Sequence, residues 1–251
     1  MPPPTTLDLL WGSPQRPKRG PKPSLTLERI VAEAIGHADA EGLASLSMQR
    51  LAERLGCAKM ALYRYVPGKA ELTALMLDAA LGPPPDAAAT VPVDAAVPGD
   101  EERWRAQLRA WAITMFDRMR AHPWADELAR GVRPVGPNEV GWMESALTAL
   151  ADSGLTGAEG LDAVALLAGH VRSLALQAAA ADGGAMEPGL GRQVSQALAA
   201  QADRYPRTLA AFAESGPPGT RDNALGFGID RILDGLGALI AARTGGQVRS
   251  P

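Results

Sequence analysis

Basic and aromatic side chains crowd into one short segment of the chain, namely Lys59, Tyr63, Arg64, Tyr65 and Lys69. No carboxylate occurs between Glu53 and Glu71. A cationic, aromatic surface without acids suits a polyanion such as nucleic acid, because Lys and Arg neutralise phosphates. The alternative interpretation is a small helical hairpin with a solvated basic face.

The residues around this cluster predict the elements that position it. Ser47 is typical of a helix N-cap, and residues 48, 51, 52 and 55 repeat with the spacing of one helical face. Gly56 suits a left-handed helix end. A second helix is predicted over residues 58–65, and a turn at residues 67–68 closes it. This is the pattern of a helix-turn-helix, whose second helix lies in the DNA major groove.

This interpretation assigns a role to each candidate DNA-binding residue. Ser47 and Lys69 are expected to hold phosphates and set the register on the duplex. Met60 and Ala61 are placed to touch thymine methyl groups. The remaining candidates share base and backbone contacts: Gln49, Lys59, Tyr63, Arg64 and Tyr65.

Composition indicates an all-α protein. The 251 residues are 46% hydrophobic but only 4% aromatic, with many Ala and Leu residues and no sustained period-two alternation. The single cysteine, Cys57, excludes an internal disulfide and is expected to be a small packing residue, with a redox-sensor role as the alternative. No leader pattern occurs, and no apolar run approaches ~18 residues without polar interruption. We therefore expect a cytoplasmic protein with no membrane partner.

Charge is unevenly distributed. Residues 1–72 carry ten Lys or Arg against seven acids, whereas the rest of the chain carries fifteen against twenty-one. A basic end on an acidic body suggests that one end meets DNA.

Three regions follow from the pattern of breaks. Residues 1–24 hold seven prolines and are predicted to form a disordered arm without a helix. Its basic residues either follow phosphates or solubilise a tail. Residues 25–72 form the helix-turn-helix domain, beginning with a helix over 26–41. Residues 73–251 form an effector-binding and dimerisation domain, interrupted by a proline-rich loop at 82–99.

Two apolar helices are predicted in the body, over 157–180 and 221–243. Their apolar residues extend around most of the circumference, which is more than one core requires. We interpret them as a subunit interface of a homodimer. The alternative is a fully buried central helix in a monomer.

The segment LAERLGCAKMALYRYVPGKAEL resembles the DNA-binding signature of the tetracycline-repressor (TetR) family of bacterial regulators. The matching residues are Leu51-Ala52, Leu55-Gly56, Ala61-Leu62-Tyr63, Tyr65-Val66 and Gly68-Lys69. Ala58 departs from the family's usual Ser, which should weaken the start of the recognition helix. The resemblance implies a repressor that binds a palindromic operator as a homodimer and is released by a small effector.

The carboxy-terminal region resembles the body of the tetracycline-repressor branch. The matching residues are His122, Gly131, Arg133-Pro134, Gly154, Gly169-His170 and Phe227-Gly228. With the head, the resemblance covers most of residues 25–243. It implies a four-helix dimer interface and an effector pocket in each body.

Two departures argue against a metal–tetracycline effector. Ala129 replaces the family's metal-binding histidine, and Trp111 replaces a polar pocket amide. No carboxylate–histidine cluster has metal spacing, so no metal site or other cofactor is expected. An apolar, aromatic pocket is predicted instead, lined by Trp111, Met115, Trp142, Met143, Leu147 and His170. Plain core packing is the alternative for each of these residues.

Catalysis is not indicated. The sequence shows no nucleophile–base pair, no phosphate-binding Gly-rich turn and no paired carboxylates in a defined motif, so no catalytic residues are assigned. The competing hypothesis is a helical ligand-binding or scaffold protein without a DNA role, which leaves the basic segment 59–69 unexplained.

Overall fold

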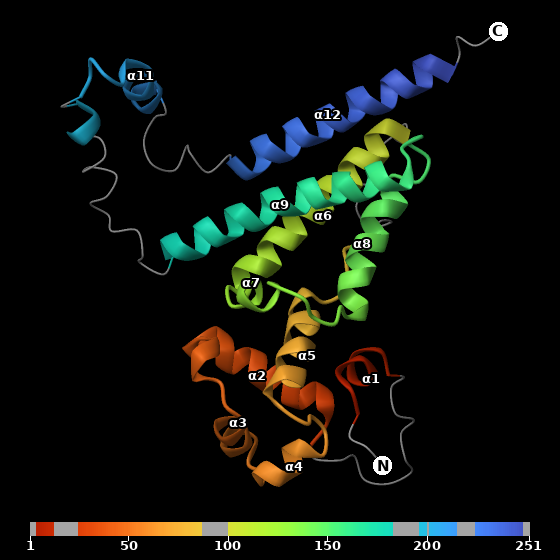
Figure 1. Cartoon of the computed structure of the whole chain (residues 1–251), viewed down its shortest axis with the longest axis vertical. Helices are drawn as coiled ribbons and strands as arrows, with labels where there is room; N and C mark the ends of the chain where they lie inside the picture. The colour runs from red at the N-terminus through yellow and green to blue at the C-terminus, as the bar shows by residue number, and fades with distance from the viewer. Residues whose placement is uncertain are drawn as a thin grey trace, which may run out of the picture.

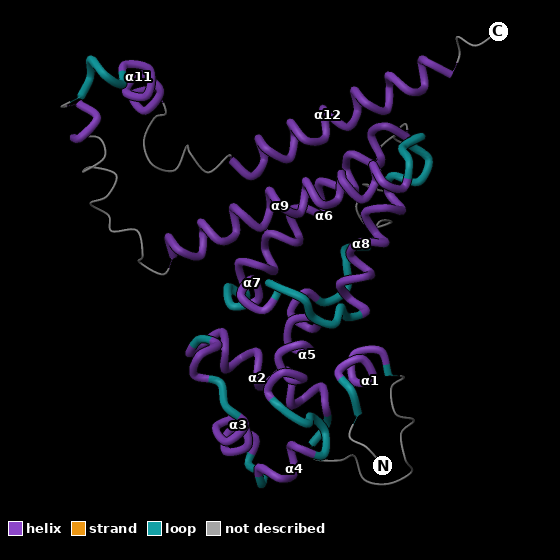
Figure 2. The backbone as a smooth tube through the Cα atoms, viewed as in Figure 1, coloured by secondary structure: helices purple, strands orange, loops and turns teal. Residues whose placement is uncertain are grey.

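The computed structural model describes residues 4–12, 25–86, 100–182, 196–199, 201–214 and 224–247. Within these ranges the regular structure is helical and no strand occurs (Figure 2). A small group of helices near the N-terminus forms a head, and longer helices form a body beside it (Figure 1). The all-α prediction is therefore confirmed.

The head contains a trihelical unit and the helix that leaves it. Its elements are α2 (Leu27–Glu41), a 3-10 turn (Leu43–Ser45), α3 (Met48–Leu55), α4 (Lys59–Tyr63) and α5 (Lys69–Leu81). Helix α2 begins after its N-cap residue Thr26 and ends at Gly42, as the sequence pattern predicts. One apolar core joins these elements, and Ile30, Leu62 and Leu72 are fully buried in it. Cys57 is a free thiol that packs partly buried against this core, which fits the packing role.

An additional helix, α1 (Thr6–Trp11), precedes the head. The prediction that proline density excludes a helix from residues 1–24 is wrong here. Six residues without proline are enough for a short helix, because the Thr5 and Asp8 side chains cap its first turn reciprocally. The basic residues proposed as a DNA-binding arm lie outside the described residues.

The body is built from α6 (Asp100–Ala121), α7 (Ala125–Leu128), α8 (Pro137–Ala149), α9 (Gly157–Asp182), α11 (Pro206–Glu214) and α12 (Ala224–Gln247). Its core lies between α6, α8, α9 and α12, and Leu108, Leu167 and Ile229 are fully buried there. Residues 87–99 of the predicted proline-rich loop lie outside the described residues, and residues 82–86 form an irregular connection.

One helix in the described residues, Gly157–Ala180, is long and apolar enough to cross a membrane by length and composition. The sequence expectation concerned apolar runs without polar interruption, and Glu159, Asp162 and Arg172 interrupt this helix, so that expectation is not contradicted. In the fold this helix packs against α6 and α12, with Ala163, Leu167 and Val171 in the core.

Candidate nucleic-acid interface

The first helix of the helix-turn-helix has the ends that its sequence predicts. The Ser47 hydroxyl accepts a hydrogen bond from the backbone N–H of Arg50 at 3.2 Å, which caps α3. Gly56 ends the helix in the left-handed region, with φ 66° and ψ 34°. The Ser47 hydroxyl hydrogen remains available, since a hydroxyl can donate while it accepts. Its predicted phosphate contact is therefore compatible with its capping role.

The second helix, α4, is shorter than the predicted 58–65 span. Ala58 occupies the N-cap and makes no side-chain hydrogen bond. Helix α4 therefore starts without a side-chain cap, as the sequence predicts. Leu62 and Val66 are fully buried and fix the helix on the head. On the opposite side Met60 is 72% exposed, and Lys59 and Arg64 are exposed as well. The exposed face therefore carries the basic residues that the sequence analysis selected.

The cations of the two helices differ in their charge partners. On α3, Arg54 pairs with Glu33 at 2.6 Å, and Arg50 lies 3.9 Å from Glu41. On α4, the Lys59 ammonium lies 5.8 Å from the Tyr63 ring centre, and among the described residues neither Lys59 nor Arg64 has an ion-pair partner. Positive charge is therefore compensated on α3 and uncompensated on α4.

Lys69 has a contact that the sequence did not predict. Its ammonium donates to the backbone carbonyl of Leu46 at 2.8 Å and so joins the start of α5 to the chain just before α3. An ammonium has three donors, so two remain for a phosphate. Gln49 is also engaged, because its amide donates to the Glu53 carboxylate at 2.8 Å. Tyr63 and Tyr65 are half-buried and pack against the head core.

Two of the predicted effector residues form a buried aromatic pair. The rings of Trp111 and Trp142 meet edge to face with centres 5.5 Å apart. The Trp111 indole donates to the Trp142 carbonyl, and the Trp142 indole donates to the Gly82 carbonyl, each at 2.9 Å. Both polar handles are thus satisfied within the protein. Met115 is buried in the same core as the two tryptophans.

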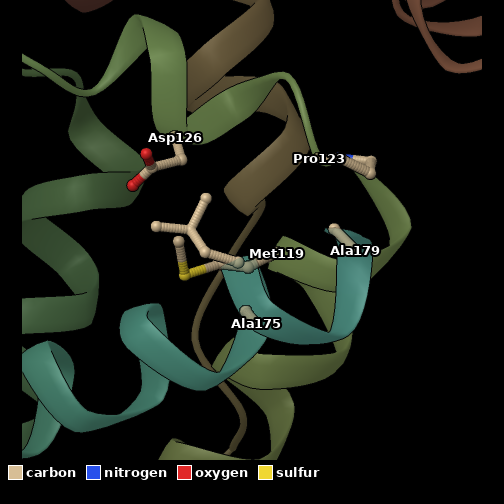
Figure 3. A pocket seen from close by; sticks show the side chains of 6 residues that line it. Met119, Pro123, Asp126, Ala175 and Ala179 are labelled. Atoms are coloured by element: carbon tan, nitrogen blue, oxygen red, sulfur yellow. The ribbon is translucent and has the colours of Figure 1, made fainter. Parts of the chain in front are cut away.

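The other three predicted effector residues are not brought together with that pair. Met143 is 44% exposed, and Leu147 is half-buried on α8 beside Gly160. His170 lies near the Leu225 carbonyl of α12 at 3.3 Å, and a Cβ at Gly228 would collide with its ring. None of the six lines the cavity shown in Figure 3, so their common role in effector binding stays a prediction.

That cavity is partly open to solvent, has a volume of only about 10 Å³ and lies where the end of α6 and the start of α7 meet α9. Asp126 is buried at its edge and pairs with Arg130 at 2.7 Å and Arg172 at 3.1 Å. Burial raises the pKa of the Asp126 carboxyl, but the two arginines outweigh it and hold the pKa below its ordinary value. Within the described residues no group of three or more His, Cys, Asp or Glu could hold a metal ion.

The sequence did not predict the residues that make polar contacts between the head and the body. Asp39 of α2 accepts hydrogen bonds from the His122 ring at 2.8 Å and the Trp124 indole at 2.7 Å. Asp78 of α5 is buried and accepts the backbone N–H of Asn138 at 2.9 Å and of Glu139 at 3.2 Å. Burial raises the pKa of Asp78, and the hydrogen bonds oppose that shift. The sequence signal that could have indicated this contact is the position of Asp78, an acid within the apolar run LMLDAAL.

Trp124 and Ala125 complete the connection, because they lie in the core of the head although they belong to the α6–α7 segment. A trihelical head with an uncompensated basic recognition helix, joined in this way to a helical body, defines a helix-turn-helix regulator with a separate regulatory domain.

Comparison with known proteins identifies the family. The sequence matches the description "Bacterial regulatory proteins, tetR family" over residues 30–76 and "Tetracyclin repressor-like, C-terminal domain" over residues 97–240. It is 40% identical over 249 residues to the HTH-type transcriptional repressor DrrR1 of Streptomyces coeruleorubidus, covering 96% of this chain and 87% of DrrR1. The chain belongs to the TetR family of bacterial regulatory proteins.

Solved structures agree with this assignment. Apo ActR of Streptomyces coelicolor aligns with a TM-score of 0.71 at 27% identity, covering 89% of this chain and all of ActR. ActR in complex with actinorhodin aligns with a TM-score of 0.63 at 29% identity, covering 85% and 96% of the two chains. The tetracycline repressor protein class C of Escherichia coli is 25% identical over 212 residues, covering 84% and 90%.

Proposed function

We propose that this repressor reads a palindromic operator as a homodimer, with α4 of each protomer in successive major grooves. The observation that carries this proposal is the exposed face of α4, where Lys59 and Arg64 have no carboxylate partner among the described residues. Two-fold symmetry then requires half-sites roughly 34–36 Å apart. The DNA-binding set remains the one predicted from the sequence, and Lys69 also fixes the start of α5.

The exposed apolar residues of α9 and α12 support the dimer. Leu166 of α9 is 58% exposed and Phe227 of α12 is 59% exposed, and Leu161, Leu176 and Leu239 add further apolar surface on the same two helices. Isolated protomers rarely leave a long apolar surface in water. Two copies of α9 and α12 form a four-helix interface that covers it.

Binding to the DNA that flanks the gene of this protein tests the proposal. Fluorescence anisotropy with the purified protein should give saturable binding, and footprinting should show a two-fold symmetric protected site. Analytical ultracentrifugation of the free protein should give the mass of a dimer. A monomer that binds DNA no better than a random duplex would refute this function.

The effector is proposed to be a small, largely apolar or aromatic molecule rather than a metal–tetracycline chelate. Ala129 has no metal-binding side chain, and the residues predicted for the pocket are aromatic, aliphatic or a single histidine. ActR has been solved with actinorhodin and with (S)-DNPA, so these two compounds are suitable first probes. A thermal-shift titration should show saturable stabilisation by an aromatic probe and none by magnesium–tetracycline.

The second candidate is a helical ligand-binding or scaffold protein without a DNA role. Loss of DNA binding together with retained effector binding would favour it. The absence of a catalytic motif from the sequence and the membership in a family of transcriptional regulators support a non-enzymatic role. We place the protein in the cytoplasm, where its DNA target lies.

A further inference from the structure

The short helix α1 connects the head to the turn between α7 and α8. Its first turn is capped locally: the Asp8 N–H donates to the Thr5 hydroxyl at 3.2 Å, and the Thr5 N–H donates to the Asp8 carboxylate at 2.9 Å. Helix α1 ends at Gly12, where a side chain does not fit, because a Cβ there would lie 2.3 Å from the Asp8 carbonyl oxygen. Helix α1 is therefore a defined element with a specified start and end.

One face of α1 belongs to the head. Leu10 is only 8% exposed and is part of the core that contains Ile30 and Leu72. The helix packs against α5, and Figure 1 shows it beside that helix at the level of the head. By contrast, Leu7 on the same helix is 55% exposed.

The last residue of α1 reaches the body. The Trp11 indole N–H donates to the backbone carbonyl of Val135 at 2.9 Å, and Val135 lies in the turn between α7 and α8. The Trp11 ring itself is 51% exposed, so it fills no core position. Its specific contribution is the bond between head and turn.

The turn that receives this bond is itself a fixed unit. The Arg133 guanidinium donates to the Glu139 carboxylate at 2.6 Å across the turn. On one side of the turn, Trp124 and Ala125 lie in the head core. On the other side, Asp78 holds the start of α8. The turn is therefore held by contacts with the head on both of its sides.

We propose that α1 is a clasp that couples the α7–α8 turn to the head, with Trp11 as its positioning residue. The clasp adds a further connection between the body and the DNA-reading unit, beside the connector helix α5 and the hydrogen bonds of Asp39 with His122 and Trp124. It restricts the range of head orientations in the free protein. A movement of the turn changes that restriction, and the orientation of α4 changes with it.

Distance measurements between head and body test this proposal without DNA or effector. In a Cys57→Ala background, spin labels at Glu28→Cys on α2 and Glu144→Cys on α8 report the head–body distance by pulsed electron paramagnetic resonance. Both positions are exposed. Excess unlabelled protein limits the signal to pairs within one protomer.

Trp11→Phe removes the N–H donor and keeps a ring, and Leu10→Ala removes the anchor in the head. Both substitutions should broaden or shift the distance distribution. Leu7→Ala, on the exposed side of the same helix, is the matched control and should leave the distribution unchanged. Circular dichroism should show a native fold for Trp11→Phe, because its ring fills no core position. Unchanged distributions in both Trp11→Phe and Leu10→Ala would overturn the proposal.

A functional measurement adds a second criterion. If the wild-type protein binds the DNA flanking its gene, Trp11→Phe should change the dissociation constant by about fivefold or more, the lower end of typical coupling between sites. Leu7→Ala should not change it. Failure of the wild-type protein to bind DNA would contradict the proposed function, whereas the distance result would still decide whether the clasp exists.

Discussion

Gly136 lies directly against the carboxylate of Asp78, so that a Cβ added at Gly136 would lie 2.1 Å from Oδ1 of Asp78. The two residues come from the connector helix α5 and from the start of α8. The Gly136 backbone has φ −90°, which any residue adopts, so the need for glycine is steric. The vacant space lets the Asp78 carboxylate reach the first N–H groups of α8 and cap it.

Gly136→Ala should therefore destabilise the protein by roughly 1–3 kcal/mol, as overpacking of a filled site does. Asp78→Ala should cost about 1 kcal/mol through loss of the helix cap. In the double variant the close contacts with Oδ1 and Cγ of Asp78 are removed, and the 2.8 Å contact with the Cβ at position 78 remains, so the two effects should be less than additive. Urea unfolding of the four proteins in this cycle measures the difference.

Gly141→Ala is the control for that cycle. It lies on the same helix, and its added Cβ would meet nothing closer than a Pro84 carbon at 3.6 Å. This substitution should be neutral or stabilise the protein by up to about 1 kcal/mol, because Ala favours a helix interior over Gly. Equal destabilisation by alanine at positions 136 and 141 would contradict the steric role of Asp78.

Asp126 should make stability depend on pH in the acid range. Its folded-state pKa is below the ordinary value of 3.8, so its contribution is present above that value and is lost as pH falls through the folded-state pKa. At neutral pH, Asp126→Asn should cost about 1 kcal/mol, since both arginine partners are partly solvated. The stability difference between wild type and Asp126→Asn should shrink below pH 3.8. A constant difference from neutral pH down to well below that value would contradict the ion pairs.

Lys59→Ala should weaken binding to all DNA sequences and reduce the slope of log affinity against log salt by about one for each protomer. The reason is that Lys59 carries a charge with no partner among the described residues. Arg207→Ala, which removes an exposed cation from α11, is the matched control and should leave the slope unchanged. If the two variants behave alike, α4 does not face the DNA.

Trp111→Phe should destabilise the body by about 0.5–1.5 kcal/mol, because it removes the buried hydrogen bond from the Trp111 indole to the Trp142 carbonyl. Met143→Ala, at a 44% exposed position, should change stability by less than about 0.5 kcal/mol. Thermal unfolding compares the two. If either substitution weakens the binding of an aromatic probe while the free energy of unfolding is unchanged, that residue lines the effector pocket.

Local patterns allowed most of the head to be predicted. The Ser47 cap, the apolar repeat of α3 and the left-handed Gly56 are all signals within a few residues of one another. The uncapped start of α4 was also predictable, because Ala58 has no side-chain acceptor. These features depend on the neighbouring sequence, and tertiary packing does not override them.

Contacts between distant segments could not be predicted in this way. The proline count of residues 1–24 concealed the helix Thr6–Trp11, whose Leu10 is buried only because the head lies beside it. The bond from Trp11 to Val135 and the pairing of Asp78 with the start of α8 join residues far apart in the chain. Likewise, the aromatic residues of the body suggest a pocket in the sequence. In the fold, however, the Trp111 and Trp142 rings pack against each other in the core.

The most direct test of the DNA-binding account is the affinity of the purified protein for the DNA flanking its own gene, measured at two salt concentrations with wild type and Lys59→Ala/Arg64→Ala. The account predicts tight, salt-sensitive binding to a palindromic site by the wild type. The double variant should bind the same site far more weakly and with a shallower salt dependence. Equal binding by the two proteins, with equal salt slopes, would contradict the assignment of α4 as the DNA-reading helix.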